Sequence, residues 1–124
     1  MSFSYKKHDA FPNAILIRDF IEEVNVKEII SSWEYLLSNH MLEGSIKGVI
    51  NNLIGCRLQI NMESFNTLIS YLKKNEILRK LKLAVICDNP QFIIFPLLGE
   101  MEEKQLQIRV FSTETAAVNW IMFG

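Results

Sequence analysis

Cysteine, histidine, proline and glycine are all scarce in this 124-residue sequence, and its acidic and basic side chains nearly cancel. Two cysteines in a domain of this size indicate free thiols and a cytoplasmic location, not a disulfide framework. The formal net charge of −1 argues against a chain whose main work is to bind nucleic acid through its phosphates. No stretch approaches the roughly 20 apolar residues of a membrane span, and no apolar segment follows the first residues as in a signal peptide.

Motifs that carry catalysis or bind metals and cofactors are also lacking. His8 and His40 have no second histidine or cysteine at ligand spacing, so no metal site is expected. No glycine-rich phosphate-binding motif occurs, so no cofactor is expected either. Cys87 has the character of a small core residue, and Cys56 has no histidine companion that would activate it as a nucleophile. We therefore expect a protein that is not an enzyme.

Apolar residues make up 49% of the chain, which is enough for one core, and we expect a single domain over residues 1–124. Short apolar runs beside turns predict strands, and apolar residues at helical spacing behind a capping residue predict helices. The expected strands are Phe3–His8, Ala14–Phe20, Ile46–Asn51, Leu83–Cys87 and Leu106–Phe111. The expected helices begin behind Asn25, Asn61, Asn89 and Ser112, and the third covers Pro90–Glu103 with a kink at Pro96.

This order, ββαβαβαβα, predicts an α/β fold with a mixed, mostly parallel five-stranded sheet. The opening hairpin makes the first strand antiparallel to the others. Residues 51–61 are expected to form a loop. Because parallel strands end at one edge of a sheet, the polar residues that follow them would face any site there. These strand-end residues are Asn51, Asn52, Asp88, Asn89 and Ser112.

The tail carries a resemblance to a known family. It reads Arg109-Val110-Phe111-Ser112-Thr113, followed by Ala117 and Trp120-Ile121. This tail, the stretch from Val85 to Pro90, the helix capped by Asn25 and the order of elements resemble the SpoIIAA-like (STAS-like) family of small bacterial proteins. The resemblance implies a βα superhelix with strands in sequential order, helices mainly on one face, and a non-enzymatic interaction or regulatory role.

Two functions of related proteins bear on this resemblance. In the anti-sigma-factor antagonists that share the fold, a serine is phosphorylated in an Asp-Ser-Ser-Gly-type loop before the second helix. The corresponding residues here, 51–61, contain no serine or threonine, which disfavours such a switch. Lipid-transfer modules of the CRAL-TRIO kind belong to the same broad fold group, but a shared fold does not determine function.

The third expected helix contains an apolar surplus, Phe92–Leu98, that would leave apolar residues on more than one face. Three explanations stay open. The surplus forms a homodimer or binds another protein, it lines a pocket for an apolar small molecule, or neighbouring helices together with Met122 and Phe123 cover it. Protein binding or self-association is the first hypothesis, and a binding protein for an apolar or lipid-like ligand is the alternative. The residues expected to form this surface are Phe92, Ile93, Phe95, Pro96 and Leu97.

Overall fold

A five-stranded sheet, with four of its strands parallel, forms the centre of the molecule. The computed structural model describes residues 3–88 and 106–124. The strands lie in the order β1-β2-β4-β6-β7, and only the β1–β2 pair is antiparallel. Their bounds are Phe3–Lys7 for β1, Ile15–Phe20 for β2, Gly48–Asn52 for β4, Lys82–Ile86 for β6 and Gln107–Phe111 for β7. The predicted α/β class and the mixed, mostly parallel sheet are therefore confirmed.

A second, two-stranded sheet lies beside the first. It pairs β3 (Glu23–Asn25) with β5 (Arg57–Gln59) in parallel. The prediction that residues 51–61 form a loop is therefore wrong in part. The backbone N–H of Arg57 donates to the carbonyl of Glu22 at 2.6 Å, so this strand depends on a contact with a distant segment. A three-residue strand also leaves no periodic apolar pattern in the sequence.

Four helices are present in the described part of the chain: α1 (Val26–Ser38), α2 (Met62–Lys74), α3 (Glu76–Lys80) and α5 (Glu114–Phe123). The predicted caps Asn25 and Asn61 are confirmed, and each side chain accepts a hydrogen bond from the backbone N–H three residues later. The predicted cap Ser112 is wrong, because the hydroxyl of Thr113 accepts from the N–H of Ala116 at 3.2 Å. None of these helices has both the length and the apolar character needed to cross a bilayer.

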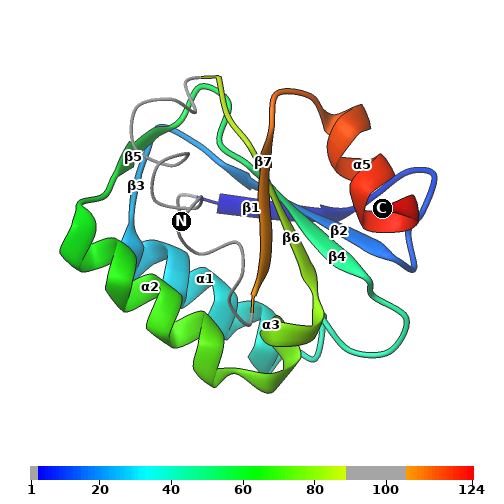
Figure 1. The fold of residues 1–124 in the computed structure, drawn as a ribbon, viewed down its shortest axis with the longest axis horizontal. Helices are drawn as coiled ribbons and strands as arrows, with labels where there is room; N and C mark the ends of the chain where they lie inside the picture. The colour runs from blue at the N-terminus through cyan, green and yellow to red at the C-terminus, as the bar shows by residue number, and fades with distance from the viewer. Residues whose placement is uncertain (1–2, 89–105) are drawn as a thin grey trace.

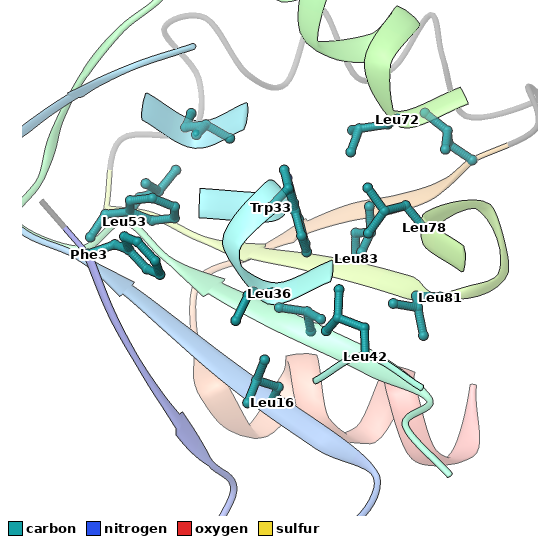
Figure 2. Close-up of a cluster of buried hydrophobic side chains, with 14 of the residues drawn as sticks. Phe3, Leu16, Trp33, Leu36, Leu42, Leu53, Leu72, Leu78, Leu81 and Leu83 are labelled. Carbon is teal, nitrogen blue, oxygen red and sulfur yellow. The ribbon is translucent and has the colours of Figure 1, made fainter. Parts of the chain in front are cut away.

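The helices lie on two sides of the sheet, with α1 and α2 side by side on one side and α5 on the other (Figure 1). Side chains alternate along each strand, so Leu16 packs with α1 and α2 whereas Ile15 and Ile17 pack with α5. Trp33 and Leu36 project from α1 into the larger core (Figure 2). Strands buried on both faces explain why the apolar runs in the sequence are nearly continuous.

Gly48 lets α5 pack closely on β4. A Cβ atom at this position would lie 2.6 Å from the carbonyl oxygen of Lys82 and 2.9 Å from Cγ2 of Ile121. The first of these atoms belongs to the backbone of the neighbouring strand and cannot rotate away. Glycine is therefore required here by space alone.

The C-terminus of α1 is closed by a Schellman motif. The N–H of His40 donates to the carbonyl of Leu37 at 3.1 Å, and the N–H of Met41 donates to that of Leu36 at 3.0 Å. His40 occupies the position that usually holds glycine, with a φ of 56°. A non-glycine residue in this left-handed conformation stores strain at the end of the helix.

Candidate functional site

The side chains of Asn51 and Asn52 make hydrogen bonds to residues of the neighbouring strands. Asn51 and Asn52 lie within β4, because this strand pairs with both neighbours through Asn52, beyond the end that the sequence predicts. The amide Nδ2 of Asn52 donates to Oδ1 of Asp19 at 2.8 Å, and its Oδ1 accepts from the N–H of Ile54 at 3.1 Å. The prediction that both asparagines belong to a strand-end loop is wrong.

The other predicted site residues divide into two groups. Asp88 and Ser112 are exposed beyond the ends of β6 and β7. The remaining residues lie outside the described residues, and this also holds for the expected helix Pro90–Glu103. They are Asn89, Phe92, Ile93, Phe95, Pro96 and Leu97.

A buried arginine, which the sequence did not single out, lies under α1. Within residues 3–88 and 106–124, Arg18 is the only charged side chain that is buried, with 2% of its surface exposed. It lies on β2 and shares a face with Leu16 and Phe20, because side chains alternate along a strand. The available signal was a charged residue in the middle of the apolar stretch 14–20, which the sequence predicts to be a strand.

Three hydrogen bonds hold the guanidinium of Arg18. Its Nε donates to Oδ1 of Asn51 at 2.9 Å, and its Nη1 donates to Oγ of Ser32 at 2.9 Å and to the carbonyl of Ile29 at 3.4 Å. Asn51 is opposite Arg18 in the β2–β4 register, and its Nδ2 donates to the carbonyl of Ala84 at 2.9 Å. The amide of Asn51 is therefore fixed with its oxygen toward the arginine.

Two aromatic rings complete the surroundings of this cation. The Cζ atom of Arg18 lies 3.6 Å from the ring centroid of Trp33 and 4.7 Å from that of Phe20. Both distances are within the range of a cation–π interaction, which is stronger when the pair is shielded from water. Hydrogen bonds and rings thus fix the guanidinium in one position between β2, β4 and α1.

No carboxylate balances this charge among the residues that the structure describes. The ion pairs there join other residues and involve partly exposed side chains. Burial lowers the pKa of Arg18 well below its usual value, and the nearby Tyr71 acts in the opposite direction with a smaller effect. Arginine stays protonated in proteins, so the folded chain holds a buried positive charge whose neighbours are neutral groups.

A cavity of about 90 Å³ lies next to Arg18, between the sheet and the two long helices. Its wall is apolar, apart from Arg18 and the amide of Asn51, over the described part of the chain. The apolar wall includes Ile29 and Trp33 from α1, Phe65 and Ile69 from α2, and Leu83 and Val85 from β6. The cavity thus combines an apolar wall with one fixed cation.

The two cysteines lie in different surroundings, Cys56 partly exposed and Cys87 buried. Burial, together with the carboxylates of Glu28 and Glu23, raises the pKa of the Cys56 thiol and so disfavours the thiolate. Cys87 is buried at the end of β6, as expected of a small core residue. No group of three or more histidine, cysteine, aspartate or glutamate side chains could hold a metal within the described residues.

Comparisons of the chain with protein-family models and with curated proteins found no match. The resemblance to the SpoIIAA-like family therefore stays a prediction, based on the residues of the tail and the order of elements.

Proposed function

We propose that this protein is a non-enzymatic binding module for a small ligand, which occupies the cavity between the sheet and helices α1 and α2. The single observation that carries the proposal is an apolar cavity of about 90 Å³ with a fixed polar corner at Arg18 and Asn51. Ligand sites in proteins commonly combine an apolar wall with a few polar groups that orient the ligand. The sequence analysis gives a binding protein for an apolar or lipid-like ligand as the alternative function. The ligand proposed here is smaller than a lipid.

The cavity volume limits the size of the ligand. A cavity of about 150 Å³ holds benzene, which has six non-hydrogen atoms, so about 90 Å³ holds roughly four. At a limit of about −1.5 kcal/mol per atom, four atoms give a dissociation constant no tighter than about 40 µM. A ligand bound this weakly must be abundant where the protein acts, which suits a regulatory module that responds to its concentration.

Several features support a SpoIIAA-like superhelix as the fold behind this module. The parallel strands follow one another in space in their sequence order, and α1 and α2 share one face of the sheet. Helices α1, α2 and α3 contribute to the core on one face of the sheet, and α5 packs on the opposite face. We include a cytoplasmic location in the proposal, because the two free cysteines suit a reducing compartment.

Protein binding or self-association through residues 92–98 stays a separate prediction, because these residues lie outside the described part of the chain. Its basis is the apolar composition of Phe92–Leu98. We expect the double substitution of Phe92 and Phe95 with serine to lower the mass measured by light scattering. A wild-type chain that is already a monomer at high concentration would rule out the dimer.

Xenon tests the proposed cavity directly, because it is a neutral atom that enters apolar cavities. We expect xenon under pressure to shift the methyl NMR signals of Ile69, Leu83 and Val85, and to leave those of Val118 on the opposite face unchanged. Val85→Phe should fill the cavity and abolish these shifts, and Val118→Phe is the matched control. Unshifted cavity methyls in the wild type would refute the proposed function.

A further inference from the structure

We propose that the ligand carries a single carboxylate, which accepts hydrogen bonds from Nη2 of Arg18. The ligand class is a monocarboxylate of about four non-hydrogen atoms, the size that the cavity admits. This inference rests on the proposed function, because it names the chemistry of the ligand in the same cavity.

The donors of Arg18 are only partly used. A guanidinium has five N–H groups, one on Nε and two on each terminal nitrogen. Nε donates to Asn51, and Nη1 donates to Ser32 and to the carbonyl of Ile29. No group in residues 3–88 and 106–124 accepts a hydrogen bond from Nη2, although the side chain is 98% buried. Buried donors in proteins are almost always paired with a protein group or an ordered water, so this nitrogen can donate to an oxygen atom placed in the cavity that Arg18 lines.

The geometry prepares Arg18 for an anion. The guanidinium is held by the hydrogen bond from Nε to Asn51 and by the ring of Trp33, whose centroid lies 3.6 Å from Cζ, so little freedom is lost when a ligand binds. The cation is already removed from water in the folded chain, and the surrounding medium is apolar. An opposite charge placed there interacts far more strongly than it would at the surface.

The rest of the wall decides which anion fits. Arg18 is the only cation among the described residues that line the cavity, and the amide of Asn51 is already engaged at both ends. A dicarboxylate or a doubly charged phosphate would therefore bring a second negative charge against an apolar wall, which is costly. A single carboxylate with a short hydrocarbon part matches both the charge and the wall.

The experiment compares anions with neutral molecules of the same shape. Acetate and propionate are titrated into the wild-type protein and followed by proton–nitrogen NMR, with acetamide and propionamide as neutral partners and sodium chloride keeping the ionic strength constant. We expect saturable shifts of the Asn51 side-chain amide and the Trp33 indole N–H with the carboxylates. The two amides should bind at least about tenfold more weakly, a difference of one decade in dissociation constant.

Two variants locate the binding. Arg18→Met should abolish the acetate shifts, and Lys82→Met, which removes a cation on the opposite side of the sheet, should leave them unchanged. If Arg18→Met does not fold, Ser32→Ala replaces it. This variant releases one Nη1 donor, so acetate should still bind but with an altered dissociation constant.

The possible failures are distinguishable. If xenon enters the cavity but acetate and acetamide bind equally, or chloride competes equally with acetate, the carboxylate inference is overturned and the proposed function stands. If neither xenon nor acetate shifts the cavity signals, both are overturned. Carboxylate shifts confined to surface lysines would also overturn the inference.

Discussion

The buried cation makes an unusual prediction about stability, namely that removing its partner costs more than removing the cation itself. Arg18→Met eliminates two hydrogen bonds of 2.9 Å and the ring contacts with Trp33 and Phe20. It also eliminates the cost of holding a charge away from water. Asn51→Leu, in contrast, leaves the charge in place and removes the acceptor of Nε.

The magnitudes follow from the contacts. Two hydrogen bonds to a charged group contribute roughly 3–6 kcal/mol, and a shielded cation–π contact adds about 2 kcal/mol. Several kcal/mol of desolvation oppose these gains, so Arg18→Met should lower the free energy of unfolding by only about 2 kcal/mol. Asn51→Leu should lower it by about 3–5 kcal/mol, because it leaves two buried groups without these hydrogen bonds, Nε of the cation and the carbonyl of Ala84.

Urea unfolding followed by circular dichroism measures both values, and the double variant closes a cycle. We expect the double variant to be more stable than Asn51→Leu alone, because the substitution at Arg18 removes the charge that lacks a partner. Ser32→Ala is the control, because Nη1 keeps the carbonyl of Ile29 as an acceptor when the Ser32 hydroxyl is removed, so this variant should cost only about 1–2 kcal/mol. Strictly additive costs, or a larger loss for Arg18→Met than for Asn51→Leu, would refute this reasoning.

Three further predictions concern other parts of the fold. Gly48→Ala should destabilise the chain by about 2–3 kcal/mol, because the new Cβ would lie 2.6 Å from the Lys82 carbonyl, and a thermal melt that matches wild type would contradict this. His40→Gly should raise the free energy of unfolding by about 1 kcal/mol, because glycine adopts the left-handed φ of 56° without strain; a lower value in urea unfolding would contradict this. Burial, followed by the nearby Glu34 carboxylate, raises the pKa of Tyr71, but no described acceptor lies within ordinary hydrogen-bond distance of its hydroxyl, so Tyr71→Phe should cost less than about 1 kcal/mol at neutral pH. The unfolded chain loses the Tyr71 proton first, so wild-type stability should fall as the pH rises above about 10, and a pH series should show a shallower fall for Tyr71→Phe.

Local chemistry accounts for what could be predicted from the sequence. Asn25 with Glu28 forms a capping box within four residues, and apolar runs such as 14–20 lie in strands buried on both faces. The strand β5 and the short helix α3 were missed, because three and five residues are too few to show a period. The sequence predicts Ser112 as a cap and the structure uses Thr113, because two adjacent hydroxyl residues give the same local signal.

The site could not be predicted for a different reason. Arg18 and Asn51 are 33 residues apart, and they meet only because β2 and β4 pair in a particular register. The cavity beside them depends on how α1 and α2 pack over the sheet, which no local pattern encodes. The predicted apolar surface at residues 92–98 lies outside the described residues, so it neither supports nor opposes the cavity.

The most direct test is the free energy of unfolding in acetate compared with chloride at equal ionic strength. A ligand that binds only the folded chain stabilises it by about 1.4 kcal/mol when its concentration is ten times the dissociation constant. A gain of this size in the wild type, and none in Arg18→Met, is the predicted result. Equal stability of the wild type in the two salts, up to the solubility limit of acetate, would contradict a carboxylate site at Arg18.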